Sequence, residues 1–264
     1  MLKIVIAGPR GNMGREAVKM VHADSNFQLV GVVDIEHDGL KMKEVPDMEP
    51  LDVQIYENIT ECLQQTKCDI LIDLTSPKAG KKHMLAAFDN GVRPVVGTTG
   101  FTEEDVKELS DIAQSKQIGA IIAPNFAIGA ILMMKFSQMA ARYMPHVEII
   151  EQHHDRKLDA PSGTAVKTAQ MITEVRQSMK QGHPDEEEQL KGARGADYDG
   201  LRIHSVRLPG LVAHQEVIFG GEGQTLKLRH DSLNRTSFMP GIKLACETVM
   251  KLDVLVYGLE HIME

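Results

Sequence analysis

Short apolar runs alternate with amphipathic stretches along the first 126 residues of the chain. Leu2 to Ala7 has the length and apolar character of a buried strand, and the stretch after it places Ala17, Val18 and Val21 on one face of a helix. The same alternation predicts further strands at Gln28–Val33, Val53–Tyr56, Asp69–Leu74, Pro94–Val96 and Ala120–Ile122, and helices at Ile59–Gln65, Lys78–Asp89 and Thr102–Ser115. Repeated strand–helix units predict a parallel, doubly wound sheet in an α/β fold.

The pattern changes in the second half of the chain. It predicts helices at Ile128–Arg142, from Ala165 to about Ser178 and at Pro240–Met250, and strands at Val147–Ile150, Leu201–Leu208, Leu211–Phe219 and Thr225–Arg229. The last three strands are separated by glycine-containing turns, which indicates a second, mixed sheet in an α+β domain. We therefore expect one domain over 1–126 plus 240–264 and another over 127–239. The polar, acidic run at 181–188 is expected to be a solvated loop.

Composition narrows the class of protein. The chain has 264 residues, 42% hydrophobic content and a formal net charge of −8. That charge argues against nucleic-acid binding, and any anionic ligand must be held by a local cationic pocket. The three cysteines have no metal or redox spacing, and no secretory leader or membrane span is recognisable, so we expect reduced thiols and a cytoplasmic protein.

A glycine-rich turn, Gly8-Pro9-Arg10-Gly11-Asn12-Met13-Gly14, lies between the first strand and the first helix. Such a turn lets a pyrophosphate approach the helix N-terminus, and the next strand ends in Asp34, where a carboxylate would accept hydrogen bonds from ribose hydroxyls. The arrangement predicts a Rossmann-type dinucleotide site; a tight turn without ligand is the alternative. Asp34 favours NAD over NADP, whereas Arg10 and Lys41 could offset its charge, so NADH and NADPH both stay open.

Loops after the later strands are expected at the same edge of the sheet, where ligands bind in doubly wound folds. Two of them are assigned to the nicotinamide: Gly97-Thr98-Thr99, where Gly97 would admit the ring, and Ala123-Pro124-Asn125-Phe126, whose backbone would hold the carboxamide. Ordinary turn chemistry would explain the same residues.

The most unusual chemistry lies in the passage from Glu151 to Ala165, Glu-Gln-His-His-Asp-Arg-Lys-Leu-Asp-Ala-Pro-Ser-Gly-Thr-Ala, between a predicted strand and a predicted helix. Cationic side chains and the amides of a helix N-terminus would face one small volume, as suits a compact dicarboxylate with a proton donor beside it. The alternative is one buried and one exposed histidine with a solvated lysine. A metal site at His153, His154 and Asp155 is disfavoured because no metal-type spacing supports it.

This passage resembles the 4-hydroxy-tetrahydrodipicolinate reductase family, also called dihydrodipicolinate reductase. The resemblance extends to Gly8–Gly14, Gly97–Gly100, Ala123–Phe126 and the run Val206-Arg-Leu-Pro-Gly-Leu-Val-Ala-His-Gln215, and so spans nearly the whole chain. It implies a cytoplasmic homotetramer that reduces a small cyclic dicarboxylate with NADH or NADPH in diaminopimelate and lysine biosynthesis. The second domain would then bind substrate and form the tetramer.

Matching positions imply a role for each residue. His153 and Lys157 would be the acid–base pair, with Lys157 the first choice of proton donor; His154 would contact substrate, and Gly163 and Thr164 would clamp a carboxylate. The sequence departs from the family pattern at Ile35, where NADPH-favouring relatives often carry a basic residue, and at Arg10. Rival hypotheses are another nicotinamide-dependent dehydrogenase acting on an amino acid or semialdehyde, a Schiff-base lyase and a dinucleotide-binding sensor.

Overall fold

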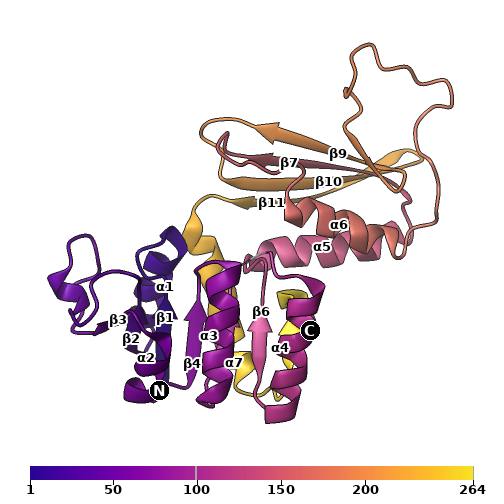
Figure 1. Ribbon diagram of the computed structural model, residues 1–264. Helices are drawn as coiled ribbons and strands as arrows, with labels where there is room; N and C mark the ends of the chain where they lie inside the picture. The colour runs from indigo at the N-terminus through magenta and orange to yellow at the C-terminus, as the bar shows by residue number, and fades with distance from the viewer. Residues whose placement is uncertain (99, 264) are drawn as a thin grey trace. The chain divides into compact units, whose positions relative to one another are not determined.

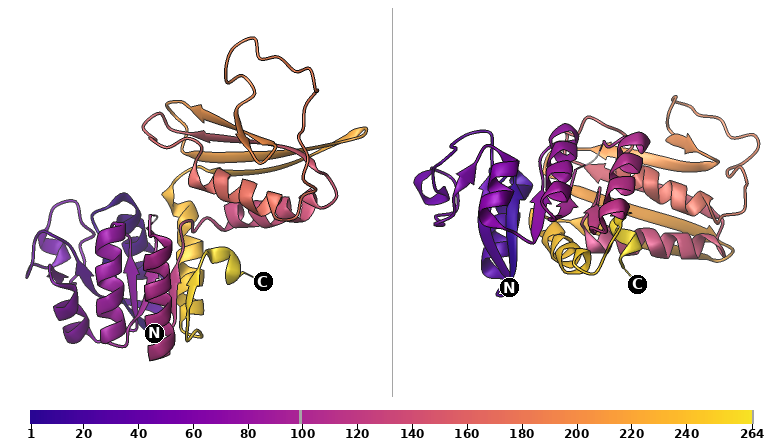
Figure 2. Two further views of the ribbon diagram at one scale, coloured as in Figure 1. Left: turned by 45° about the vertical axis from the view of Figure 1, so that its right-hand side comes forward. Right: turned by 60° about the horizontal axis from the view of Figure 1, so that its bottom comes forward.

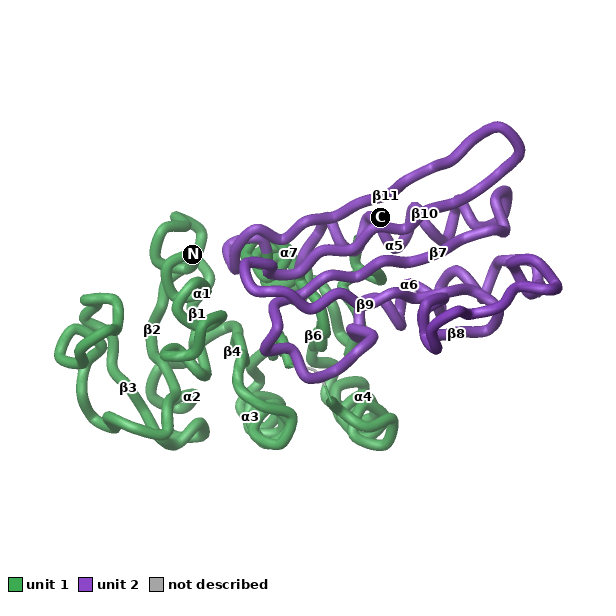
Figure 3. Tube along the Cα trace, turned by 90° about the horizontal axis from the view of Figure 1, so that it is seen from above, with its two compact units in different colours: residues 1–126, 238–264 green, residues 127–237 purple. Residues whose placement is uncertain are grey.

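A computed structural model of the chain describes residues 1–98 and 100–263. The chain forms two compact units, unit 1 over Met1–Phe126 and Phe238–Glu264 and unit 2 over Ala127–Ser237 (Figure 3).

Unit 1 is built on a seven-stranded parallel sheet (Figure 1). In spatial order its strands are β12 (Leu255–Tyr257), β6 (Ala120–Ile122), β5 (Arg93–Val96), β4 (Ile70–Asp73), β1 (Leu2–Ala7), β2 (Phe27–Val33) and β3 (Ile55–Tyr56). Its α-helices are α1 (Asn12–Ala23), α2 (Ile59–Thr66), α3 (Pro77–Asp89), α4 (Glu103–Lys116) and α7 (Met239–Val249). The strand order reverses at β1, which is where doubly wound sheets bind their ligands.

Helices pack on both faces of this sheet. Helices α1 and α7 contact each other and the sheet, and α2, α3 and α4 form a second, continuous row (Figure 2). Strands covered on both sides carry apolar residues at successive positions, and Ile70, Leu71 and Ile72 of β4 are all fully buried. The Rossmann-type fold expected from the sequence is confirmed.

Unit 2 contains a five-stranded mixed sheet, with two helices on one of its faces (Figures 1 and 2). Its strands lie in the order β11 (Gln224–Ser232), β10 (Ala213–Gly221), β7 (His146–His153), β9 (Leu201–Arg207) and β8 (Ala196–Tyr198), and its helices are α5 (Ile128–Ala141) and α6 (Gly163–Thr173). Strand β10 is antiparallel to β7 and β11, whereas β9 is parallel to β7. The predicted second mixed sheet is therefore confirmed.

Side chains of β7 alternate between the two faces of the sheet. Val147, Ile149 and Glu151 are buried, whereas Glu148 and Ile150 between them are only partly covered. Because successive residues of a strand point to opposite faces, Glu151 lies at a position where the pattern calls for an apolar residue. The carboxylate of Glu151 therefore lies on the inner face of β7, where it contacts the predicted catalytic residue His153.

Some element bounds differ from those predicted. Strand β7 continues to His153 because that residue is paired with Arg207 of β9 and with Ala213 of β10. Helix α6 ends at Thr173 rather than near Ser178. Beyond it, the buried side chain of Arg176 donates to the carbonyl oxygens of Pro145, Met179 and Gly200 and so holds the segment that follows the helix. Over residues 1–98 and 100–263, none of the helices has the length and apolar character needed to cross a membrane.

Candidate active site

The glycine-rich turn of unit 1 packs closely against the start of α1. Gly8 has φ of 81°, and a Cβ at Gly14 would lie 1.9 Å from the carbonyl oxygen of Gly8, so the helix approaches the turn too closely for any side chain there. Helix α1 begins after Gly11 without a side-chain cap. Its first amides are therefore available to an anion such as a pyrophosphate.

Asp34 follows β2 beside this turn, and its carboxylate is paired with Arg10 from within the turn. The guanidinium donates to both carboxylate oxygens of Asp34, at 2.7 and 3.0 Å, and to Glu36 at 2.6 Å. The hydrogen bond to Asp34 is the main cause of a raised pKa at Arg10. Lys41, the other cation considered for this site, is instead paired with Asp52.

The loops after β4, β5 and β6 form the rest of the predicted cofactor site. A Cβ on Gly97 would lie 2.6 Å from the side chain of Leu74 and 2.7 Å from the ring of Phe126, so a side chain here would have to displace both. Thr98, Ala123 and Phe126 are buried, whereas Pro124 is exposed and Asn125 is partly exposed. Thr99 lies outside the described residues.

In the loop after β4, Asp73 is a fully buried carboxylate. It accepts from the backbone and hydroxyl of Thr75, and from Nδ1 of His83 on α3 at 2.5 Å. Thr75 in turn would contact a Cβ placed on Gly8, so Asp73 fixes a side chain against the glycine-rich turn.

In unit 2, Glu151 organises the passage that holds the predicted catalytic residues. The side chain of Glu151 is fully buried, and its carboxylate accepts from Nδ1 of His153 at 2.6 Å and from both terminal nitrogens of Arg207 at 2.8 and 2.9 Å. The backbone N–H of Ser162 donates to it at 3.3 Å. One acid therefore joins the end of β7, the end of β9 and the start of α6.

Burial and hydrogen bonding act in opposite directions on the pKa of Glu151. Burial is the largest single influence and favours the neutral acid, but hydrogen bonds from His153, Arg207 and Ser205 together outweigh it and lower the pKa to about 2. Glu151 is therefore a carboxylate at neutral pH.

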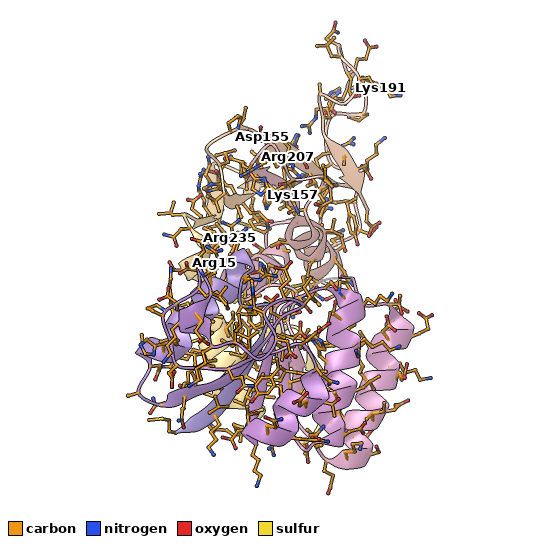
Figure 4. All side chains as sticks on the ribbon, turned by 60° about the vertical axis from the view of Figure 1, so that its left-hand side comes forward. Arg15, Asp155, Lys157, Lys191, Arg207 and Arg235 are labelled. Atoms are coloured by element: carbon orange, nitrogen blue, oxygen red, sulfur yellow. The ribbon has the colours of Figure 1, made fainter. Side chains whose placement is uncertain are left out.

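Lys157 lies in the turn that connects β7 to α6. Its backbone N–H donates to the carbonyl oxygen of His154, and its ammonium contacts the carboxylate of Asp159 at 2.7 Å, which lowers the pKa of Asp159. In unit 2, Asp155, Lys157 and Arg207 gather at one end of the sheet, whereas Lys191 belongs to a separate loop (Figure 4). Nδ1 of His154 is buried and has no hydrogen-bond partner among residues 1–98 and 100–263.

Helix α6 begins at a polar N-terminus. The side chain of Ser162 accepts from the backbone N–H of Ala165 at 3.2 Å, and a Cβ added to Gly163 would meet no atom of the described part of the chain within 4 Å. The space beside Gly163 lets a ligand reach the backbone of Gly163 and Thr164. Both residues lie where a carboxylate would meet the positive end of the helix dipole.

The predicted site residues thus fall into one group in each unit, and the sequence-based analysis missed members of both. It gave no role to Glu151 or Arg207, nor to the Asp73–His83 pair. The available signal for Glu151 was an acid at a position that, by strand alternation, shares the inward face of Val147 and Ile149. Nothing local in the sequence indicated that Arg207, on a distant strand, would be its partner.

Comparison with known proteins covers both units. The family model described as dihydrodipicolinate reductase, N-terminus, matches residues 2–126, and the one described as dihydrodipicolinate reductase, C-terminus, matches residues 129–263. The chain is 66% identical over 264 residues to 4-hydroxy-tetrahydrodipicolinate reductase of Halalkalibacterium halodurans, with 100% of each chain covered. It is 63% identical to the protein of that name from Geobacillus thermodenitrificans, with 100% of this chain and 99% of the relative covered.

A solved structure is similar over the same length. Dipicolinate-bound dihydrodipicolinate reductase from Paenisporosarcina sp. TG-14 has a TM-score of 0.91 and 54% sequence identity to this chain, with 100% of both chains covered.

Proposed function

The chain belongs to the dihydrodipicolinate reductase family, and we propose that it reduces 4-hydroxy-tetrahydrodipicolinate to tetrahydrodipicolinate with NADH or NADPH, a step of diaminopimelate and lysine biosynthesis. The observation that carries this proposal is that one family model matches each half of the chain. A relative named 4-hydroxy-tetrahydrodipicolinate reductase also matches the chain over the full length of both proteins. The reaction needs a cofactor site and a substrate site, and each unit supplies the residues for one.

We assign the dicarboxylate substrate to unit 2. The helix N-terminus at Gly163 and Thr164 suits one carboxylate, and His154, with an unpartnered buried nitrogen, suits a polar contact with the ligand. The relative from Paenisporosarcina was solved with dipicolinate, a planar cyclic dicarboxylate, which supports a ligand of this shape.

The net reaction takes up a hydride and a proton and releases the 4-hydroxyl group as water. The bound nicotinamide supplies the hydride. We assign the proton to Lys157, whose ammonium is held by Asp159, and place His153 beside it as the second member of the acid–base pair. Substrate carboxylates would offset the positive charge of this cluster.

For the cofactor, we assign the pyrophosphate to the turn from Gly8 through Met13, and the nicotinamide to Gly97, Thr98, Thr99 and the loop from Ala123 to Phe126. Gly14 and Gly97 have no room for a side chain, so the backbone of both loops stays bare at these positions, which supports this assignment. We propose that both cofactors are accepted. Asp34 offers acceptors to the ribose of NADH, while Arg10 turns from Asp34 and Glu36 to the 2′-phosphate of NADPH.

We further propose a cytoplasmic homotetramer assembled through unit 2. The sheet face opposite α5 and α6 carries the partly covered apolar side chains of Ile150, Val206 and Ile218. These residues would pack against a second copy of the sheet. Light scattering coupled to gel filtration measures the mass of the assembly. A monomeric mass at micromolar concentration would rule out the proposed homotetramer.

One assay tests the activity. The condensation product of pyruvate and aspartate semialdehyde is generated freshly and added to the protein with NADH or NADPH, and nicotinamide absorbance is followed. We expect absorbance to fall with both cofactors only when the cyclic substrate is present. Oxidation of NADH by an amino-acid-derived semialdehyde or imine, without any response to the cyclic dicarboxylate, would instead identify another dehydrogenase on the same fold.

A further inference from the structure

Hydrogen-bond donors surround the carboxylate of Glu151. The imidazole of His153, the guanidinium of Arg207 and the backbone N–H of Ser162 all point a nitrogen at it. An ionised carboxylate is an acceptor only, so it satisfies all of them, whereas a carboxamide of the same shape would turn an N–H group toward a donor.

This arrangement decides which nitrogen of His153 carries a proton. Because Glu151 is ionised, the 2.6 Å contact requires a hydrogen on Nδ1 of the ring. Nε2 then carries a free lone pair in the neutral ring and an N–H group in the charged ring. In both forms the same hydrogen bond fixes the direction in which Nε2 points.

The same carboxylate also holds the segment that carries Lys157. Arg207 contacts Glu151 through both terminal nitrogens and donates to the carbonyl oxygen of Asp159 at 2.7 Å, and Asp159 is the partner of Lys157. Three residues after Asp159, Ser162 donates its backbone N–H to Glu151 and caps α6. Glu151 is thus connected to His153 before the turn and, directly or through Arg207, to Ser162 and Asp159 near its C-terminal end.

We infer that Glu151, with Arg207 as its counter-ion, is a positioning residue for the reduction: it keeps His153 protonated at Nδ1 with Nε2 directed at the substrate, and it holds the turn that presents Lys157. This inference rests on the proposed function, since it names the residue that prepares the acid–base pair of that reaction. A role confined to folding would require neither a particular tautomer of His153 nor an effect on turnover.

The first test needs no substrate. Nitrogen-15-labelled histidine is incorporated, and the ring signals of His153 are assigned by their loss in a His153→Asn variant. We expect the neutral ring of the wild type to carry its proton on Nδ1, and the Glu151→Gln variant to lose that preference. A wild-type ring protonated on Nε2 would overturn the inference, even if no Glu151 variant can be purified.

The second test measures turnover. We expect Glu151→Gln to lower kcat by about 10- to 100-fold, because a general acid or base loses much of its contribution to the rate when it is misplaced. The KM for the nicotinamide cofactor should stay within about twofold. Glu151→Asp keeps the charge and should recover part of the lost kcat and the Nδ1 proton. A folded Glu151→Gln protein with wild-type kcat would overturn the inference.

Glu148 offers a matched control on the same strand. It also accepts from an arginine and a histidine, Arg194 at 2.6 Å and His204 at 2.8 Å, but it lies on the opposite face of the sheet. Glu148→Gln should leave the tautomer of His153 unchanged and kcat within about twofold. If the wild type fails to reduce the cyclic dicarboxylate, the proposed function fails, but the tautomer measurement still tests the geometry; if it succeeds and Glu151→Gln is unaffected, only the positioning role fails.

Discussion

The guanidinium of Arg10 spans the carboxylate of Asp34, with one nitrogen on each oxygen at 2.7 and 3.0 Å. Asp34 is the acid proposed to bind the ribose of NADH, and Arg10 is the cation proposed to contact the 2′-phosphate of NADPH. In the sequence analysis Asp34 favoured NADH and Arg10 favoured NADPH; in the structure the two side chains form one ion pair. Cofactor choice becomes a question of which group Arg10 contacts once a dinucleotide is bound.

Replacing Arg10 should separate the two cofactors. We expect Arg10→Ala to raise the KM for NADPH by about 10-fold or more, since a charged hydrogen bond to phosphate contributes about 1.5–3 kcal/mol, and to change the KM for NADH by less than about threefold. Steady-state kinetics with each cofactor measures this. Lys41→Ala is the control: Lys41 is paired with Asp52, so its replacement should change the KM for neither NADPH nor NADH. Equal losses with both cofactors would show that Arg10 does not read the phosphate.

Lys157 is expected to act in the chemical step rather than in cofactor binding. We expect Lys157→Ala to reduce kcat by about 100-fold or more, the usual contribution of a general acid, with little change in the Kd for NADH measured by fluorescence. Lys191→Ala removes a lysine on a separate loop of unit 2 and should have wild-type kinetics. Wild-type turnover of Lys157→Ala would exclude Lys157 as the proton donor.

The sequence predicted the repeated strand–helix units because buried parallel strands such as β4 carry an unbroken apolar signal. It did not predict β12 or β8, since each has three residues without a buried one and depends on a partner strand distant in sequence. The conspicuous polar residues His153 and Lys157 were identified as candidates from local composition. Their connection through Glu151 and Arg207 was not, because it depends on the register of β7 with β9.

Ionised Glu151 should contribute to stability in a defined range of pH. Its folded pKa of about 2 lies below the ordinary value of 4.5, so its contribution is present above pH 4.5 and is lost as the pH falls toward 2. The shift corresponds to at most about 3–4 kcal/mol. We expect the difference in unfolding free energy between wild type and Glu151→Gln, from urea titrations, to be largest near pH 7 and to shrink below pH 4.5. A difference independent of pH would mean that the charge of Glu151 is not what stabilises the fold.

Two glycines should respond oppositely to the same added methyl group. At Gly14 a Cβ would lie 1.9 Å from the carbonyl oxygen of Gly8, so Gly14→Ala should lower the melting temperature of unit 1 and weaken cofactor binding. At Gly163 a Cβ meets nothing within 4 Å, and alanine in a helix is favoured over glycine by about 1 kcal/mol. Thermal unfolding and cofactor binding measure the first effect, and thermal unfolding should show no loss for Gly163→Ala.

Gly163→Ala therefore tests binding without a stability penalty. If a substrate carboxylate lies against the backbone of Gly163 and Thr164, the added methyl group intrudes on it, and we expect the KM for the cyclic dicarboxylate to rise by about 10-fold. The KM for NADH should not change, because its proposed site lies in unit 1. Dipicolinate provides an independent probe, and its inhibition constant should rise in parallel. Because the substitution fills open space beside the helix N-terminus, an unchanged KM together with unchanged dipicolinate inhibition would place the carboxylate elsewhere on unit 2.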